Sequence, residues 1–528
     1  MATAKPIDVP QAEPNPYRWL IALSVMLGTV LELLDTSIVN VALPHMQGTF
    51  SASVDEITWV ASSYLIANGI MIPLTAWISS RFGRKNYFLF SVTTFVAASA
   101  MCGAAQSLDQ MVFFRLLQGF AGAAMQPSSQ AIMMETFPPR EQTTAMSIWS
   151  FGMMVAPVMG PTVGGWITDN WSWRWCFYIN VPVGILAILM ANTFLEDPPY
   201  LRARSRGKVD TAGIGCIVLA LASLQLVADR GQRADWFQSA WVVNASIVSV
   251  IAFGLFIWRE LSFASPVLDL TILSNRIFTI TTGFSVSMTF ALWGVNLINP
   301  IFLQEYMGYS AWRAGLALAP RALSAMVTLF TVGQLSRLGV NTKPLIPVGV
   351  VMLIVSLRMM AQWNAQVGPH EILAALVVSG LGNGLIFAQL SAIGLATVPA
   401  KDMGNAASLQ GMLRNMSSAL GVSLLTSLLV ERQQVHQSRL VEHFSIFDAW
   451  RMSERVSRMP GAPIFQFAGR TFLSQRHGLA SVYAQVQSQA SILSFQDIYW
   501  VLSLWLALLL PAYLVIRKAA TSRVISTH

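Results

Sequence analysis

Long apolar segments follow one another along almost the whole chain, and their length constrains the fold more than any other feature of the sequence. An α-helix rises 1.5 Å per residue, so about 20 apolar residues cross the ~30 Å hydrocarbon core of a bilayer. We count fourteen segments of this kind, which predicts an all-α polytopic membrane protein with fourteen transmembrane helices. The predicted spans are residues 19–43, 56–78, 86–106, 109–133, 143–168, 176–195, 211–229, 237–258, 276–303, 312–335, 344–362, 371–397, 403–430 and 497–516.

Composition supports a membrane protein and excludes several other classes. Hydrophobic residues make up 54% of the chain and charged residues only 11%, whereas soluble proteins carry about 25% charged residues. The net charge of +8 comes from short basic loops and does not indicate a nucleic-acid partner. Three widely spaced cysteines indicate neither a disulfide framework nor a metal site.

Positive charge is unevenly distributed between the two sets of loops, which predicts the orientation in the membrane. Loops on the side of the N-terminus hold about 18 basic residues, whereas the short loops on the other side hold about four. Because Lys and Arg are enriched in cytoplasmic loops, we expect both termini in the cytoplasm. The polar residues before the first span lack an apolar signal core and indicate a cytoplasmic tail.

Loop lengths divide the chain into two halves. A basic stretch, Leu201-Arg-Ala-Arg-Ser-Arg-Gly-Lys208, follows the sixth span, and a weak repeat supports the division because Ser80-Arg-Phe-Gly83 and Ser336-Arg-Leu-Gly339 each end the second helix of a half. We therefore expect two six-helix bundles plus two additional helices. The predicted divisions are a tail at 1–18, a six-helix bundle at 19–195, a linker with two extra helices at 196–275, a second bundle at 276–516 and a tail at 517–528.

One long insertion, residues 431–496, lies on the outer side of the second bundle. Its polar beginning can extend the thirteenth span as a helix, a break follows at Met459-Pro-Gly-Ala-Pro463, and residues 480–494 predict a returning helix without Gly or Pro. Long loops in compact proteins are commonly functional. The insertion is therefore either a docking surface for another protein or an ordered cap without a partner.

Two carboxylates interrupt the first apolar span. Glu32 and Asp35 are three residues apart and therefore share one helical face. A charge in the middle of a membrane costs roughly 2.5–3.5 kcal/mol and usually marks a functional site. We interpret the two acids as a proton-coupling site, and the alternative is a structural acid bound to a neighbouring helix beside an acid that reaches toward water.

Arg115 in the fourth span provides a candidate partner for these acids. Counting residues from the outer edge places Arg115 and Glu32 at about 10 Å depth and Asp35 at about 6 Å. An arginine at this depth favours the charged form of a facing carboxylate. The alternative is that Arg115 extends toward the outer headgroups instead.

The fifth span carries a glycine- and proline-rich motif. Glycines four residues apart let another helix approach closely, and prolines favour a kink. Such a helix suits a seam that seals and slides, although the same spacing also occurs in ordinary tight packing. The motif residues are Gly152, Pro157, Gly160, Pro161, Gly164 and Gly165.

Further polar residues in the spans are candidates for lining a substrate cavity. Arg321 and Arg414 lie near mid-depth, where each can contact an anionic group or hydrogen-bond backbone carbonyls at a kink. The embedded acids lie in the first half only, which assigns proton handling to that half. The candidate cavity residues are Asn40, Gln118, Gln126, Asn296, Asn299, Gln304, Arg321, Gln410 and Arg414.

Several of these motifs together resemble the major facilitator superfamily and its 14-helix drug:proton antiporter branch. The segments that carry the resemblance are Leu34–Pro44, Arg115-Leu-Leu-Gln118-Gly119, Gly152–Gly165 and Trp173–Gly184. The resemblance implies a fold of two rocking six-helix bundles, proton transfer that involves Arg115, and a cytoplasmic gate loop. That loop comprises Arg81, Gly83, Arg84 and Lys85, but Ser80 stands where the branch usually has an acid, which leaves its charge latch unassigned.

The outer insertion resembles that of inner-membrane pumps of the EmrB type from Gram-negative bacteria. This resemblance implies a periplasmic adaptor (a membrane fusion protein) and an outer-membrane channel as partners, besides membrane lipid, protons and lipophilic small-molecule substrates. We expect proton-coupled export of amphipathic toxic compounds, and the alternatives are export of one endogenous metabolite, fatty acid or lipid, or a non-transporting receptor. No nucleotide-binding loop, metal-ligand cluster or nucleophile constellation is present in the sequence, so we expect no enzyme, metal or cofactor, with the proton gradient as energy source.

Overall fold

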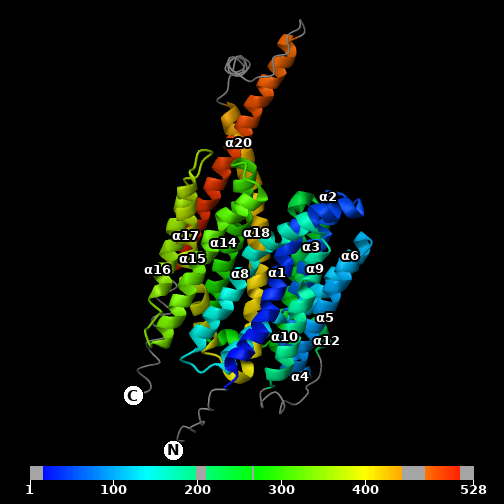
Figure 1. Ribbon diagram of the computed structural model, residues 1–528, viewed down its shortest axis with the longest axis vertical. Helices are drawn as coiled ribbons and strands as arrows, with labels where there is room; N and C mark the ends of the chain where they lie inside the picture. The colour runs from blue at the N-terminus through cyan, green and yellow to red at the C-terminus, as the bar shows by residue number, and fades with distance from the viewer. Residues whose placement is uncertain (1–15, 198–209, 264–266, 443–469, 512–528) are drawn as a thin grey trace, which may run out of the picture.

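A computed structural model describes residues 16–197, 210–263, 267–442 and 470–511 of the chain. Every regular element in these ranges is a helix, which confirms the all-α prediction. The helices stand side by side, and two of them rise well beyond the rest at one end (Figure 1). We call this the hairpin end and the opposite end, where the first helix begins, the Arg18 end.

The first half of the chain contains six spans, three of which are made of two consecutive helices. The helix pair α3–α4 bends by 61° next to Pro73, because proline removes a backbone donor and favours a kink. The elements are α1 (Arg18–Phe50), α2 (Val54–Ile57), α3 (Trp59–Met71), α4 (Leu74–Phe82), α5 (Arg84–Ala104), α6 (Leu108–Gly122), α7 (Met125–Thr136), α8 (Gln142–Asn170), α9 (Trp175–Tyr178) and α10 (Asn180–Phe194).

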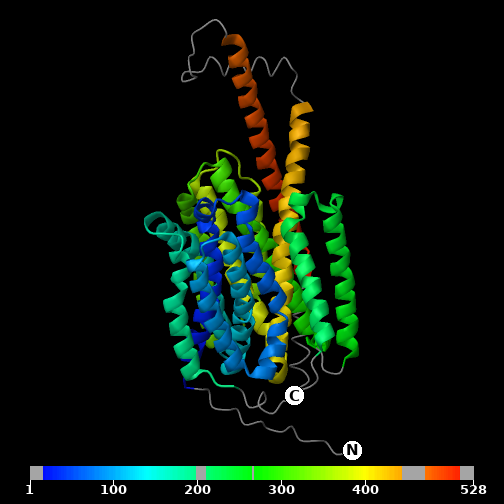
Figure 2. The ribbon, with the colours of Figure 1, turned by 90° about the vertical axis from the view of Figure 1, so that its right-hand side faces the viewer.

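An additional helix pair, α12 (Thr211–Arg230) and α13 (Ala240–Ser262), stands beside the two halves (Figure 2). On one side the Ser62 hydroxyl of α3 donates to Asp229 at 2.6 Å. On the other side the indole of Trp236 donates to Ser427 of α18 at 3.0 Å. The pair therefore touches both halves near the hairpin end.

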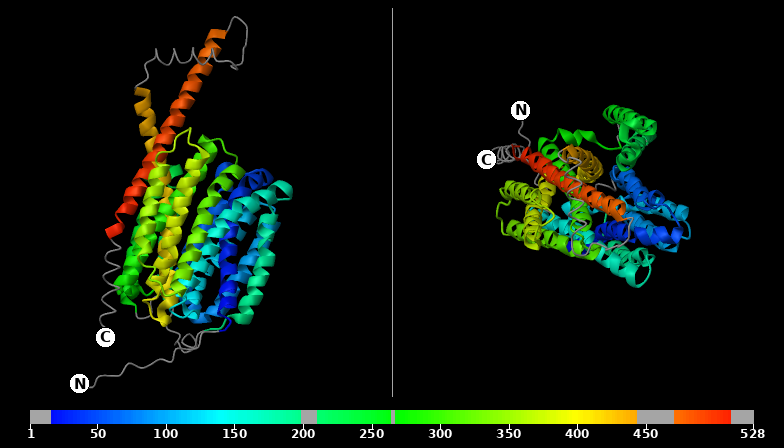
Figure 3. Two further views of the ribbon diagram at one scale, coloured as in Figure 1. Left: turned by 60° about the vertical axis from the view of Figure 1, so that its left-hand side comes forward. Right: turned by 90° about the horizontal axis from the view of Figure 1, so that it is seen from above.

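The second half contains α14 (Arg276–Ile301), α15 (Ala311–Arg337), α16 (Leu345–Met360), α17 (Pro369–Leu395), α18 (Met403–Glu442) and α20 (Arg470–Ala507). A π-helical turn, Phe302–Tyr306, continues α14. With 40 residues, α18 is about 60 Å long and exceeds the thickness of a bilayer. It projects beside α20 (Figure 3), and His436 and Asp497 join the two helices at 2.8 Å.

The described helices can be compared with the fourteen spans predicted from the sequence. Each of the fourteen spans falls on one helix or on two or three consecutive helices, although the last extends to 516 beyond the described residues. By length and hydropathy, ten described helices can cross a membrane, or eleven if α3–α4 counts as one. The all-α membrane fold is therefore shown, while the count of fourteen stays a prediction. Residues 443–469, including the predicted break at 459–463, lie outside the described ranges.

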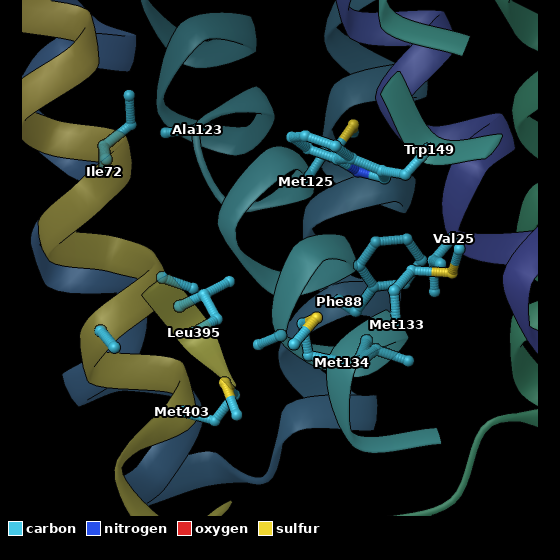
Figure 4. Close-up of a cluster of buried hydrophobic side chains, with 14 of the residues drawn as sticks. Val25, Ile72, Phe88, Ala123, Met125, Met133, Met134, Trp149, Leu395 and Met403 are labelled. Atoms are coloured by element: carbon cyan, nitrogen blue, oxygen red, sulfur yellow. The ribbon is translucent and has the colours of Figure 1, made fainter. Parts of the chain in front are cut away.

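The two halves pack against each other toward the Arg18 end. The Thr144 hydroxyl in the first turn of α8 donates to the carbonyl of Gly333 in α15 at 2.8 Å. One continuous apolar cluster includes side chains from both halves, among them Met125 and Met133 of α7 and Met403 of α18. Figure 4 shows these methionines around the contact. The two halves are therefore in direct contact at the Arg18 end.

Candidate functional site

Asp35 lies at the centre of a buried polar cluster in the first half. Its side chain is 0% exposed, because α8 and α10 pack against α1 and side chains of α6 and α10 surround the carboxylate. Arg115 donates to one carboxylate oxygen at 2.6 Å, while Gln118 and Asn180 donate to the other at 2.9 and 2.6 Å. Three donors from two further helices thus satisfy the buried carboxylate.

Arg115 occupies a position between α1 and α3. Its Nε donates to the carbonyl of Val60 at 3.0 Å, and Nη1 donates to Gln118 at 2.7 Å as well as to Asp35. The guanidinium also lies 4.3 Å from the ring centroid of Tyr64, within cation–π distance. The predicted pairing of Arg115 with an acid of α1 is present, at Asp35 and not at Glu32, and the alternative in which Arg115 extends toward headgroups is wrong because this side chain is only 1% exposed.

A close approach between α6 and α3 positions this arginine. A Cβ at Gly119 would collide with the backbone carbonyl of Tyr64, so only glycine permits the observed spacing of the helices. Gly119 follows Arg115 by one turn, and Tyr64 follows Val60 by one turn. The close contact therefore brings Arg115 within reach of the Val60 carbonyl.

We expect Gly119→Ala to lower both stability and transport, because the added methyl pushes α6 away from α3. Overpacking of this kind costs about 1–3 kcal/mol, and the displacement removes Arg115 from Val60 and Asp35. Thermal unfolding of the purified protein measures the first effect, and efflux measures the second. Gly283→Ala is the matched control because a Cβ there meets nothing within 4 Å; equal behaviour of the two variants would contradict this role for Gly119.

Glu32 belongs to a second polar group, one turn from Asp35. Its Oε1 accepts from Asn68 at 2.9 Å and from Gln126 at 3.3 Å. Its Oε2 is buried and has no hydrogen-bond partner among the described residues. A carboxyl oxygen in this position can hold a proton, whereas the same oxygen as part of a carboxylate loses solvation without compensation.

Sequence reasoning missed two residues that hold these acids. Asn180 bonds Asp35 and also donates to Ser99 at 3.0 Å, and Asn68 bonds Glu32. Asn68 is the one amide side chain of α3, which is a signal present in the sequence, whereas α10 carries Asn192 as well as Asn180. Asn180 also lies in the Trp173–Gly184 motif, yet the motif alone does not indicate which helix it faces.

The glycine motif of α8 packs against α1, inside the first half. A Cβ at Gly160 would collide with Ser37, and one at Gly164 would lie 3.3 Å from Ile38. Gly152 continues this face toward Met26, whereas Gly165 lies at its margin, 4.0 Å from Val41. The side chains of Pro157 and Pro161 lie outside what the structure describes. The motif therefore fits α8 closely to the turn that carries Asp35.

The gate loop between α4 and α5 receives its acids from distant parts of the first half. Gly83 has φ +89°, a conformation that glycine adopts readily, and the carboxylate of Asp197 lies beside it. Asp197 accepts from the backbone N–H of Lys85 at 2.8 Å, and Arg84 pairs with Glu135 at 2.5 Å. Arg81 lies 5.9 Å from the ring of Trp77. Asp197 and Glu135 thus hold this basic loop, although Ser80 stands where an acid is usual.

The candidate cavity residues do not gather in one place. Gln118 and Gln126 bind the acids described above, while Arg414 and Gln410 of α18 both meet Gln130 of α7. Elsewhere, Arg321 donates to Asn296 at 2.7 Å. Asn299 accepts from Tyr499 at 2.7 Å. Asn40 and Gln304 are exposed. In the described residues no group of acidic, histidine or cysteine side chains can hold a metal ion.

Comparison with known proteins identifies relatives of this architecture. The family model described as Major Facilitator Superfamily matches residues 25–422. The multidrug export protein EmrB of Escherichia coli strain K12 is 30% identical over 489 residues, which cover 91% of this chain and 92% of EmrB. The fatty acid resistance protein FarB of Neisseria gonorrhoeae is 31% identical over 450 residues, covering 84% and 87% of the two chains. The crystal structure of human MFSD10 covers 93% of this chain and 100% of its own, with a TM-score of 0.59 at 12% identity, which supports the fold alone.

Proposed function

Because this chain belongs to the major facilitator superfamily, we propose that it exports amphipathic toxic compounds across the bacterial inner membrane in exchange for protons. The buried pair of Asp35 and Arg115 carries this proposal. Its relatives include proteins whose names denote multidrug export. By the distribution of positive charge we assign the Arg18 end to the cytoplasm.

The proposed coupling acts through Asp35. Protonation removes the negative charge that holds Arg115, but the neutral carboxyl can still bond Gln118 and Asn180. The pair between α1 and α6 then weakens, and the two halves are free to rock about the substrate. Return of Arg115 to the charged carboxylate resets the site after the proton leaves toward the cytoplasm.

Glu32 is proposed as a second proton carrier. Its unpartnered Oε2 gains a donor hydrogen on protonation, and Gln126 ties its other oxygen to α7. The helix α7 also carries Gln130, which contacts α18 of the second half. A change of charge at Glu32 is therefore one helix away from the contact between the halves.

The proposed partners follow from the projecting helices. We propose that α18 and α20 contact a periplasmic adaptor, which in turn reaches an outer-membrane channel. We call the projecting parts of α18 and α20 the stem. Its exposed side includes Tyr483, whose hydroxyl accepts from Gln437 at 3.2 Å. Co-purification with the co-expressed adaptor is the test: we expect Tyr483→Arg to weaken the complex and the Gln106→Arg control, in the exposed loop between α5 and α6, to preserve it. Equal recovery with both variants would contradict the contact.

Accumulation of a fluorescent amphipathic dye in proteoliposomes tests the proposed function. We expect the reconstituted protein to move dye against its gradient when a proton gradient is imposed. Collapse of the gradient with an ionophore is expected to reduce movement to the leak of protein-free vesicles. Undiminished transport without a gradient would refute proton coupling.

Export of one endogenous metabolite, fatty acid or lipid is a second candidate function. Two observations favour it: FarB is named for fatty acid resistance, and Arg414 is a buried cation in the second half. A deletion strain discriminates between the two functions. Sensitivity to many unrelated compounds supports multidrug export, whereas sensitivity to one class supports the second candidate.

A further inference from the structure

Arg414 is a buried cation without a buried anion beside it. It lies in the first third of α18 and is 8% exposed. Among the described residues it takes part in no ion pair; its Nη2 donates to the amide oxygen of Gln130 at 3.0 Å, and its Nη1 has no hydrogen-bond partner. Burial of an uncompensated guanidinium costs several kcal/mol. A charge kept at this cost indicates a binding role.

Gln410 provides a second unsatisfied donor on the same face of α18. It precedes Arg414 by one helical turn, so the two side chains are neighbours. Its Oε1 accepts from Gln130 Nε2 at 3.1 Å, while its own Nε2 is buried and unpartnered. The amide of Gln130 is thus held between both residues. Each of them keeps a free N–H donor.

The surroundings of this pair are apolar and come from both halves. The guanidinium lies 6.0 Å from the ring centroid of Trp149 in α8 and 5.8 Å from that of Phe387 in α17. Along α18, Gly411 packs against Ile72 and Pro127, and Ile72, Met125 and Met412 belong to the same buried apolar cluster. Methionine side chains adapt their shape to different apolar partners. The two donors therefore lie at the edge of a surface suited to an alkyl or aromatic tail.

We propose that Arg414 and Gln410 bind the carboxylate of an amphipathic acid at the contact between the two halves. Two N–H donors one turn apart match the two oxygens of a carboxylate, and arginine binds carboxylates in such paired geometry. A cationic headgroup is repelled by Arg414, and a neutral headgroup leaves the buried charge uncompensated. The site thus selects for anions.

This site has a direct route to the proton carriers. Gln130, which holds both donors, follows Gln126 by one turn of α7, and Gln126 donates to Glu32. A ligand that displaces Gln130 therefore acts on the helix that contacts Glu32. This coupling rests on the proposed antiport, whereas binding of the carboxylate does not.

Calorimetric binding to the purified full-length protein in lipid nanodiscs tests the site. The probes are dodecanoate, its methyl ester and dodecylammonium, which share a tail and differ in headgroup charge. Because a hydrogen bond to a charged group contributes about 1.5–3 kcal/mol, we expect dodecanoate to bind about 10- to 100-fold more tightly than the ester. Dodecylammonium is expected to bind more weakly than either.

Two variants remove the site in different ways. Arg414→Gln is expected to abolish the preference for dodecanoate over the ester and to leave ester binding unchanged. Gln410→Glu keeps the arginine but supplies it with an internal carboxylate, so that the buried charge is paired. Dodecanoate is then expected to lose its advantage of about 10- to 100-fold over the ester. The control Arg358→Gln removes a cation of α16 that stacks on Trp500 of α20. This variant is expected to bind dodecanoate and its ester as the wild type does.

Wild-type affinity of either site variant for dodecanoate would overturn the proposal, and so would equal binding of dodecanoate and its ester. Tighter, Arg414-dependent binding of dodecyl phosphate would overturn the carboxylate assignment. Binding needs no proton gradient. If the wild type shows no gradient-driven export, only the proposed antiport is refuted. If the wild type exports the dye but does not prefer dodecanoate over its ester, only the carboxylate site is refuted.

Discussion

Asp35→Asn is expected to abolish export driven by a proton gradient. Asparagine has the shape of a protonated aspartate but cannot exchange a proton, so the site stays in one of its two states. Gln118 and Asn180 retain an amide oxygen to bond. In proteoliposomes, gradient-driven dye movement is expected to fall to the leak of empty vesicles.

The variant is expected to fold, because the proposed cycle already contains a state in which residue 35 is neutral. Size-exclusion chromatography and unchanged binding of an amphipathic ligand check this point. Asp109→Asn is the matched control: Asp109 lies exposed in the first turn of α6 and makes no contact with Asp35. Wild-type export by Asp35→Asn would remove the basis of the proposed coupling.

Arg115→Gln is expected to have the largest effect on stability. It leaves Asp35 as a buried carboxylate without a cation, and loss of one partner of a buried pair costs about 3–5 kcal/mol. It also removes the donor to the Val60 carbonyl. We expect a marked decrease in the thermal unfolding temperature together with loss of export.

Combination with Asp35→Asn separates the two causes. The double variant has no uncompensated charge, so it is expected to recover part of the stability that Arg115→Gln loses, and export stays absent. Arg115→Lys keeps the charge but lacks the planar fork that serves Asp35 and Val60 together, and we expect intermediate stability. Additive losses in the double variant would show that the two side chains are not energetically coupled.

Much of the fold follows from the sequence because a bilayer fixes the length of every span. The same dimension permits a depth estimate for each polar side chain, and this estimate placed Arg115 within one helical turn of the acids of α1, of which Asp35 is its partner. Depth does not give the rotation of a helix about its axis. For this reason the amides of Asn68 and Asn180 were not assigned to Glu32 and Asp35.

Rotation also explains why the polar residues of the second half do not form one cluster. Arg321 and Arg414 have similar predicted depths, yet Arg321 faces Asn296 and Arg414 faces Gln130 in the other half. The acids of the gate loop, Asp197 and Glu135, lie 112 and 51 residues from their partners. No local pattern identifies a partner at such a separation.

The extra helices α12 and α13 affect which side of the protein is accessible from the lipid. They cover the flank where α3 and α18 come together, and Asp229 and Trp236 fasten them to both sides of it. Along this flank, α12 and α13 separate the lipid tails from α3 and α18. The two additional helices therefore make the protein one-sided toward the lipid that surrounds it.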